Sequence, residues 1–229
     1  MLKSYFINVK DIDFEENKEF LLSLVDEKKR EKALRFKRNE DGVRTLIGDI
    51  LVRVILCRDF NYKNKDIVYE YNEFKKPFLK GNTKIHFNIS HSKDYVAVAF
   101  DDEEIGIDVE EIKEMEYEDI VKRFFTDYEY KWIMEQEEED RLQCFYKLWT
   151  LKESYVKFKG QGMKISFNSF KFDVDYKNNI CKLADNDEQI FFENYTIGNS
   201  YELSLCGLKE EMEIEEITYE ELITYSKEF

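Results

Sequence analysis

Two apolar runs flank a short polar turn in the stretch Phe87-Asn88-Ile89-Ser90-His91-Ser92-Lys93-Asp94-Tyr95-Val96-Ala97-Val98, which predicts a β-hairpin with its turn at His91–Asp94. The stretch Tyr195-Thr196-Ile197-Gly198-Asn199-Ser200-Tyr201-Glu202-Leu203-Ser204-Leu205 repeats this order of strand, turn and strand. The identity between the two is low and hairpins resemble one another, so an internal duplication stays open. A duplication predicts two similar α+β halves with a ligand in the seam between them.

Helical patterns precede each hairpin. Apolar residues recur at helical spacing from about Asp41 to Asp59 and again from about Arg141 to Lys159, where Gly160 is a natural stop. The chain therefore reads as helices followed by strands, twice over, with the boundary at about residues 101–112. The further predicted elements are strands at Ile105–Glu110, Ile165–Val174, Gln189–Thr196 and Tyr201–Cys206, and a short acidic helix near Tyr219.

Composition excludes several classes of protein. The 229 residues carry 35 Lys and Arg against 50 Asp and Glu, a net charge of −15, which argues against a nucleic-acid-coating protein. The 43% of hydrophobic residues is enough for a folded core and argues against disorder. Basic residues nevertheless dominate Lys28–Arg38, where Glu31 alone opposes seven of them. This stretch is either a solvated helix face or a site for an anion.

The cysteines and the N-terminal sequence bear on the compartment. The four cysteines are far apart and form no CxxC pair, which predicts reduced core thiols in a cytoplasmic protein. Charged residues interrupt the N-terminus before a signal peptide could form. The most apolar stretch, Ile50–Leu56, contains Arg53 and is far shorter than the ~20 residues of a membrane span. We therefore expect no membrane insertion.

Acidic and basic side chains fall at spacings that place them together. Asp108 and Glu110 stand two apart on a predicted strand and so share one face, where two carboxylates could hold a divalent cation. Their acidic surroundings equally allow a solvated surface. Trp149, Glu153 and Lys157 share one face of the long predicted helix, where Glu153 and Lys157 could also form a plain surface ion pair.

The predicted turn of the first hairpin carries Ser90 and His91, whose hydroxyl and ring, with nearby amides, could bind phosphate. Either residue could equally be structural. The sequence contains no GxSxG elbow, no P-loop and no GxGxxG motif. A serine hydrolase, a P-loop kinase and a dinucleotide dehydrogenase of the usual types are therefore not indicated.

Taken in order, these features resemble the Sfp-type 4′-phosphopantetheinyl transferases, the group named for the activator of surfactin synthetase. The family's hydrophobic-Gly-hydrophobic-Asp-x-Glu stretch reads here Ile105-Gly106-Ile107-Asp108-Val109-Glu110. Its signature helix reads Trp149-Thr150-Leu151-Lys152-Glu153-Ser154-Tyr155-Val156-Lys157. Phe87–Ser92 and Arg44–Arg53 are similar to its first-half strand and helix, and the resemblance covers about residues 5–170.

The resemblance implies an α+β (α/β) monomer of two similar subdomains related by a pseudo-twofold axis, with the ligand cleft between them. Residues 1–106 would form the N-terminal half, on the phosphoadenosine side of coenzyme A (CoA), and residues 107–229 the half that carries the metal. The implied reaction moves the 4′-phosphopantetheine group of CoA to a serine of an acyl- or peptidyl-carrier protein and releases 3′,5′-ADP.

Site residues follow from the resemblance too. They are Lys29, Lys32, Arg44 and His91 around the phosphoadenosine end, Lys76 near the adenine, Ser90 near the phosphates, and Asp108, Glu110 and Glu153 on Mg²⁺, with Mn²⁺ possible. Glu153 would also accept the proton of the carrier serine, and Lys157 would stabilise the leaving phosphate.

Carrier docking is expected at about Gly160–Asn186, through the apolar side chains of Phe158, Met163, Ile165 and Phe167. Two other interpretations remain at this stage. A non-catalytic CoA- or nucleotide-binding regulator on the same fold would need neither Glu153 nor Lys157. A structural interaction module would use its acidic surface and would not bind CoA.

Overall fold

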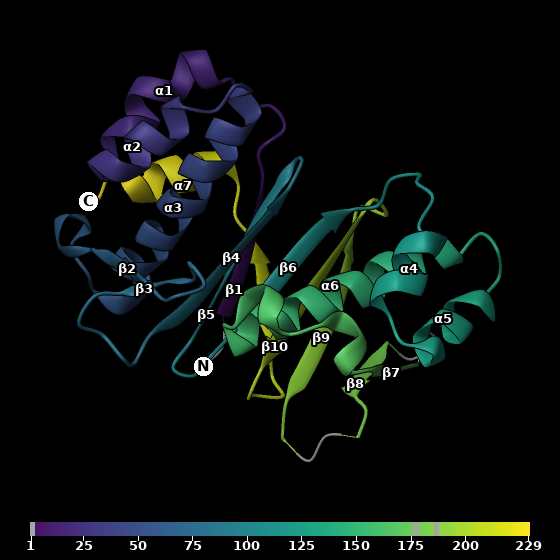
Figure 1. The fold of residues 1–229 in the computed structure, drawn as a ribbon. Coiled ribbons are helices and arrows are strands. Elements are labelled where there is room, and N and C mark those ends of the chain that lie inside the picture. The colour runs from purple at the N-terminus through teal and green to yellow at the C-terminus, as the bar shows by residue number, and fades with distance from the viewer. Residues whose placement is uncertain (1–2, 176–178, 186–187) are drawn as a thin grey trace.

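Two long helices, each lying on its own β-sheet, organise the protein. The computed structural model describes residues 3–175, 179–185 and 188–229, except the side chain of Met163. Helix α3 (Asn39–Phe60) lies on the first sheet and helix α6 (Arg141–Lys159) on the second. Figure 1 shows the two helix-and-sheet units beside each other. The mixed α+β architecture predicted from the sequence is confirmed.

The first sheet has the strand order β11-β1-β5-β4, with β11 (Glu213–Glu216) at one edge. Its centre is the predicted hairpin of β4 (His86–Ser92) and β5 (Tyr95–Asp101), and β5 pairs on its other side with β1 (Lys3–Asn8). Helix α3 covers this sheet and is buried from Leu46 to Leu56, since helices α1 (Phe14–Ser23) and α2 (Glu27–Leu34) also pack on it.

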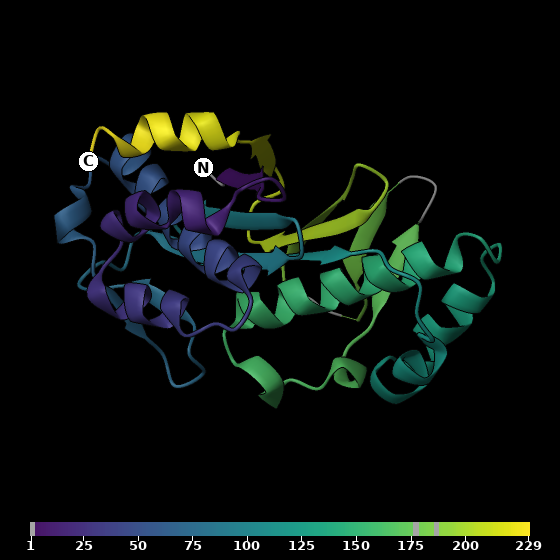
Figure 2. The ribbon, with the colours of Figure 1, turned by 90° about the horizontal axis from the view of Figure 1, so that it is seen from above.

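The second sheet has the order β6-β10-β9, from β6 (Gly106–Glu111), β9 (Phe191–Ile197) and β10 (Tyr201–Gly207). Helix α6 runs along β6 and β10, as Figure 2 shows from above. The helix comes very close to β6 at Gly106, where an added Cβ would lie 1.9 Å from the carbonyl oxygen of Ser154. Only a glycine lets the helix backbone come this near to the strand.

The remaining elements border these two units. They are β2 (Tyr69–Tyr71), β3 (Pro77–Leu79), α4 (Glu118–Phe124), α5 (Asp127–Met134), β7 (Phe172–Asp175), β8 (Ile180–Leu183) and α7 (Tyr219–Ser226). The capping box predicted at Thr126 and Glu129 is present at the start of α5. A second capping box, of Thr218 and Glu221, starts α7.

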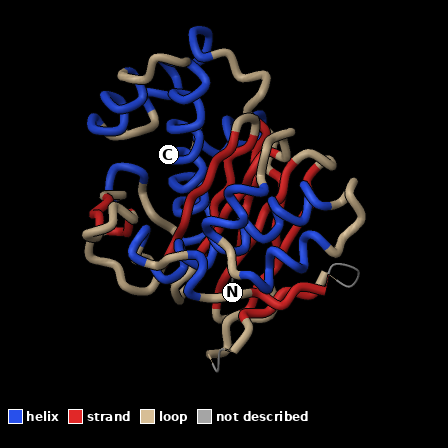
Figure 3. The backbone as a smooth tube through the Cα atoms, turned by 45° about the vertical axis from the view of Figure 1, so that its right-hand side comes forward, coloured by secondary structure: helices blue, strands red, loops and turns tan. Residues whose placement is uncertain are grey.

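Polar side chains of β4 join the two sheets. Strands β4 and β6 lie side by side, and Figure 3 shows the strands of both sheets running next to one another through the middle of the molecule. Alternate residues of β4 accept hydrogen bonds from backbone amides of β6. Asn88 Oδ1 accepts from the amide of Ile107 at 2.9 Å and Ser90 Oγ from that of Val109 at 3.3 Å. Ser92 Oγ continues the series with the amide of Glu111 at 3.1 Å. These three side-chain oxygens thus accept the hydrogen bonds that backbone carbonyls of a neighbouring strand accept in a regular sheet.

The end of the chain returns to the first unit. Strand β11 pairs in parallel with β1, and α7 packs on α3, so the C-terminus lies beside the N-terminal helices (Figure 1). The predicted division into residues 1–106 and 107–229 stays a prediction. The structure adds that β11 and α7, which this division assigns to the second half, contact the first.

Two local predictions are wrong. The turn of the first hairpin is Lys93–Asp94, because His91 and Ser92 still pair with β5. The segment Ile165–Val174 is not one strand, since it contains a 3₁₀ turn at Phe167–Ser169 and its strand starts at Phe172. Here the carbonyls of Phe167 and Phe170 accept hydrogen bonds from a lysine of α6 instead of a neighbouring strand.

The cysteines are free, as predicted, and three of them are buried. Within the described ranges, no helix combines the length and apolarity that a membrane crossing requires.

Candidate functional site

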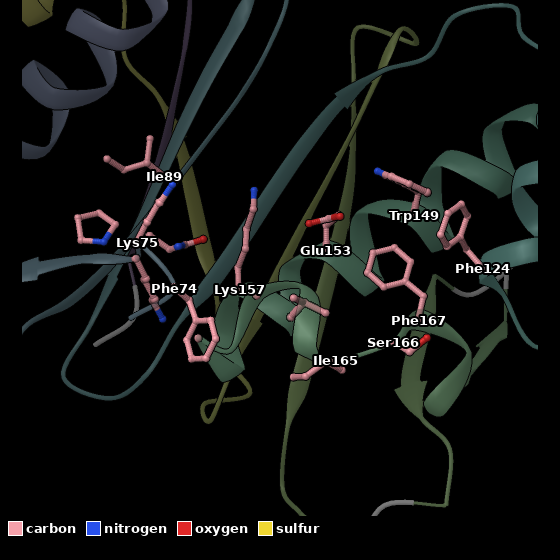
Figure 4. Close-up of a pocket in the computed structure, with 16 residues that line it drawn as sticks. Phe74, Lys75, Ile89, Phe124, Trp149, Glu153, Lys157, Ile165, Ser166 and Phe167 are labelled. Carbon is pink, nitrogen blue, oxygen red and sulfur yellow. The ribbon is translucent and has the colours of Figure 1, made fainter. Parts of the chain in front are cut away.

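One face of α6 borders a cavity of about 590 Å³. Trp149, Glu153 and Lys157 all line it, which confirms that the i, i+4, i+8 spacing places them on a common face. Figure 4 shows Glu153 and Lys157 side by side on the helix, with Trp149 and Phe167 beyond Glu153. The cavity combines an apolar wall with one acidic residue, Glu153, and three lysines, Lys75, Lys76 and Lys157.

Lys157 reaches from α6 to β6. Its Nζ lies 2.6 Å from Asp108 Oδ1 and 2.9 Å from Ser90 Oγ. Ser90 also donates to Asp108 Oδ1 at 2.9 Å. The structure therefore pairs Lys157 with Asp108, rather than in the surface ion pair with Glu153 that spacing alone allows. The other carboxylate oxygen of Asp108, Oδ2, is buried without a hydrogen-bond partner.

The three predicted acidic residues influence one another electrostatically. Burial, followed by repulsion from Asp108 and Glu110, raises the pKa of Glu153 to about 7. Burial and repulsion from Asp108 likewise raise the pKa of Glu110, whose Oε2 accepts a hydrogen bond from Ser92 at 2.8 Å. Burial raises the pKa of Asp108, against the attraction of Lys157. Crowded carboxyl groups of this kind favour either a proton or a cation.

These donors suit a hard divalent cation without forming a closed cage for one. In the part of the chain that the structure describes, no group of three metal-ligating side chains is already assembled. The buried Asp108 Oδ2, however, lacks a partner, and the neighbouring donors are carboxylate oxygens. Mg²⁺ commonly takes one or two carboxylates and completes its shell with water and substrate phosphates. An incomplete protein shell is therefore compatible with Mg²⁺.

A second, more polar cavity of about 200 Å³ collects the basic residues of the first half. Lys29, Lys32, Arg44 and His91 line it together, as the resemblance implies. Burial, with repulsion from Lys29, lowers the pKa of Lys32. The pKa of His91 is lowered by partial burial of its ring and then by repulsion from Arg44 and Lys157. Basic groups that repel one another in this way are stabilised when an anion binds between them.

The two cavities adjoin. Lys75, Pro77 and Ile89 line both of them, so one elongated ligand could span the pair. Lys76 lines the larger cavity, apart from the basic cluster, and its Nζ donates to Glu104 at 2.7 Å. Ser90 faces the α6–β6 interface and is nearly buried.

Sequence reasoning missed Ser92 and Lys75. Ser92 holds Glu110, and Lys75, with a φ of 66°, lies at the junction of the cavities. For Ser92 a signal existed, because the polar residues Asn88, Ser90 and Ser92 alternate along a strand and must share one face. For Lys75 we find no such signal.

The expected docking segment is partly described. Ile165 and Phe167 line the larger cavity, whereas Phe158 is 6% exposed and belongs to the core of the second half, so it is not available for contact. The side chain of Met163 and residues 176–178 and 186 lie outside the described residues.

The pKa of Glu153 predicts a pH-dependent stability. Its folded value of about 7 exceeds the ordinary 4.5, so folding favours the protonated form. The stabilisation is complete below about pH 4.5 and is lost as the pH rises through about 7. Without divalent cations, we expect raising the pH from about 5 to about 8 to cost the wild type on the order of 1–3 kcal/mol relative to Glu153→Gln. Thermal unfolding of both proteins across this range measures the difference, and parallel curves would contradict the prediction.

Comparison with known proteins agrees with this geometry. Residues 104–206 match the 4′-phosphopantetheinyl transferase superfamily, and residues 14–103 match a 4′-phosphopantetheinyl transferase N-terminal family. The 4′-phosphopantetheinyl transferase Sfp of Bacillus subtilis (strain 168) is 35% identical over 212 residues, which cover 91% of this chain and 94% of that protein. The 4′-phosphopantetheinyl transferase gsp of Aneurinibacillus migulanus is 34% identical over 82% of this chain and 78% of its own. The chain belongs to the 4′-phosphopantetheinyl transferase superfamily.

Proposed function

We propose that the protein transfers the 4′-phosphopantetheine group of CoA to a serine of an acyl- or peptidyl-carrier protein. Family membership supports the reaction. The observation that carries the assignment to particular residues is that acidic side chains of β6 and α6 meet Lys157 where an apolar and a basic cavity adjoin. CoA has a highly charged end and a long, weakly polar arm, and the two cavities differ in the same way.

The basic cavity would bind the phosphoadenosine end. Lys29, Lys32 and Arg44 offer concentrated positive charge on an otherwise acidic protein, and the ring of His91 beside them can donate a hydrogen bond to a phosphate. Lys76 would lie nearer to the arm than to this cluster, since it lines the larger cavity. Ser90, bonded to both Lys157 and Asp108, would orient these two groups beside the pyrophosphate.

A divalent cation, Mg²⁺ or Mn²⁺, would be held by Asp108, Glu110 and Glu153. When bound, it would supply positive charge that neutralises the pyrophosphate and stabilises the charge developing during phosphoryl transfer. The unpartnered oxygen of Asp108 and the raised pKa values of Glu110 and Glu153 support this role.

Glu153 and Lys157 would act on the reacting groups themselves. The carrier serine oxygen forms a bond to the β-phosphorus of CoA, and the bond from that phosphorus to the leaving 3′,5′-ADP oxygen breaks. Glu153 would accept the serine proton, directly or through water, and its pKa of about 7 suits a general base. Lys157 would move its ammonium group from Asp108 towards the leaving phosphate.

The carrier would dock at the rim of the larger cavity. Phe124 is 40% exposed there, and Ile165 and Phe167 add apolar surface from the segment after α6. Carrier proteins are usually acidic, as this chain is, so bulk attraction cannot bring the two together. A local apolar contact is the better basis for docking.

A mass measurement tests the proposal. With CoA, Mg²⁺ and an apo carrier protein, we expect the carrier to gain ~340 Da, the mass of the transferred arm. Omitting CoA, or replacing the acceptor serine of the carrier by alanine, should abolish the gain. An unchanged mass across a panel of peptide-synthetase, polyketide and fatty-acid carriers would refute transfer. Tight CoA binding without any gain would favour the non-catalytic regulator.

A further inference from the structure

Lys152 is a lysine of α6 that is completely buried. Its side chain is 0% exposed, and its Nζ lies 2.8 Å from Oε1 of Glu129, a carboxylate that is 1% exposed. The ammonium group also donates to the carbonyl oxygens of Phe167 at 2.8 Å and Phe170 at 2.9 Å. All three donors of the ammonium group are therefore used, and two of them hold the backbone of one loop.

Glu129 holds the same loop from its other end. Its Oε1 accepts a hydrogen bond from the amide of Phe172 at 2.9 Å, and its Oε2 accepts from the amide of Thr126 at 3.0 Å in the capping box of α5. The pair thus connects α5, α6 and the loop. Burial lowers the pKa of Lys152, and the attraction of Glu129 opposes this shift. A buried charge pair is costly to desolvate, so stability alone is a weak explanation for it.

The loop that is held in this way borders two cavities. Ser166 and Phe167 line the larger cavity, whereas residues 168–171 line a separate hollow of about 370 Å³. The ring of Phe167 packs edge-on against Trp149, with 5.4 Å between ring centroids. Because the loop borders two hollows, its backbone has room to move unless it is fixed.

We propose that Lys152 and Glu129 are positioning residues for carrier recognition: they fix the Ser166–Phe172 loop so that Phe167 forms the part of the cavity wall against which the carrier fits. The inference rests on the proposed function. It predicts that releasing the loop weakens recognition of the carrier protein. Binding of CoA should be unchanged, because the basic cavity lies on the other unit.

The test uses the double variant Lys152→Met/Glu129→Gln. It leaves no unpaired buried charge, and Gln preserves the capping box, but the carbonyls of Phe167 and Phe170 lose their donor. We expect the KM for the carrier to rise about tenfold, with the KM for CoA within about twofold of the wild type. The matched control is Lys147→Met, which removes another buried lysine of α6, one bonded to Asn179 instead of the loop. It should leave both KM values unchanged.

Phe167→Ala provides an independent test without any change of buried charge. It should raise the KM for the carrier to a similar extent, and adding it to the double variant should have little further effect, because both act through the same wall. A folded double variant with a normal carrier KM, or with an equal rise for CoA, would overturn the proposal. If the double variant does not fold, a normal carrier KM in Phe167→Ala overturns it and a raised one supports it.

Hydrogen exchange tests the anchoring of the loop by Lys152 and Glu129 independently of the proposed function. The amides of residues 166–172 should lose protection in the double variant and keep it in Lys147→Met, whether or not the wild type modifies a carrier. A wild type that transfers nothing would refute the proposed function, whereas unchanged exchange in the double variant would refute the anchor.

Discussion

Replacing Glu153 by glutamine should lower kcat by about 10³-fold while CoA still binds. The substitution keeps the size of the side chain and removes both the group proposed to accept the serine proton and one ligand proposed for the cation. It also removes a negative charge next to Asp108 and Glu110. Single-turnover transfer to a carrier, together with calorimetric CoA binding, measures the two effects separately.

The matched control for this variant is Glu111→Gln. Glu111 is on the same strand as Asp108 and Glu110, but its Oε1 bonds to the exposed Lys93 at 2.6 Å. We expect its kcat to stay within about twofold of the wild type. If Glu153→Gln turned over as fast as Glu111→Gln, Glu153 would be neither the base nor a required ligand. If Glu153→Gln no longer bound CoA, the role of Glu153 would lie in CoA binding and not in the transfer step.

Gly106→Ala should destabilise the protein strongly. The added Cβ would lie 1.9 Å from the carbonyl oxygen of Ser154 and 2.7 Å from the amide nitrogen of Phe158, both of them backbone atoms of α6. The helix must move, and we expect a loss of about 3 kcal/mol or more in the free energy of unfolding. For a chain of this size that lowers Tm by about 6–12 °C. Thermal unfolding measures it directly.

The same methyl group should also remove activity in the folded fraction. Ser154 is the neighbour of Glu153, so a shift of α6 moves Glu153 and Lys157 away from β6. A displacement of about 1 Å in a reacting group can cost about 10²-fold in rate. The control is Gly48→Ala in α3, whose Cβ would meet only side-chain methyl groups and no backbone, at 3.3 Å from Ile89 and 3.5 Å from Val96. It should change stability by less than about 1 kcal/mol. Equal Tm values for the two variants would contradict the close approach at Gly106.

Local patterns predicted the parts of the fold that local physics determines. The bounds Arg141–Lys159 of α6 follow from apolar spacing and a glycine stop, and the first hairpin follows from its alternating residues. Strands β1 and β11 were missed because each finds its partners far away in sequence. The strand expected over Ile165–Val174 was wrong because a buried lysine, and not a neighbouring strand, satisfies the loop's carbonyls.

The candidate site also has features that local patterns predict and features that depend on the whole fold. The i, i+2 rule placed Asp108 and Glu110 on one face, and the helical spacing placed Glu153 beside Lys157. The pairing of Lys157 with Asp108 could not be predicted, because the distance from α6 to β6 depends on the whole packing at Gly106. The basic stretch between Lys28 and Arg38 became informative only when Lys29 and Lys32 met Arg44 and His91 around one cavity.

The return of β11 to the first sheet has a consequence for synthesis of the chain on the ribosome. Ser4 and Glu213, which are hydrogen-bonded, stand 209 residues apart, so the N-terminal sheet is completed only after nearly the whole chain has been made. At a synthesis rate of roughly 5–20 residues per second, β11 is made on the order of 10–40 s after β1. Until then, this edge of β1 is unpaired. An open strand edge invites pairing with other chains during that time. When β11 arrives, it brings Glu213, Glu215 and Glu216, and these charges make the finished edge a poor template for aggregation.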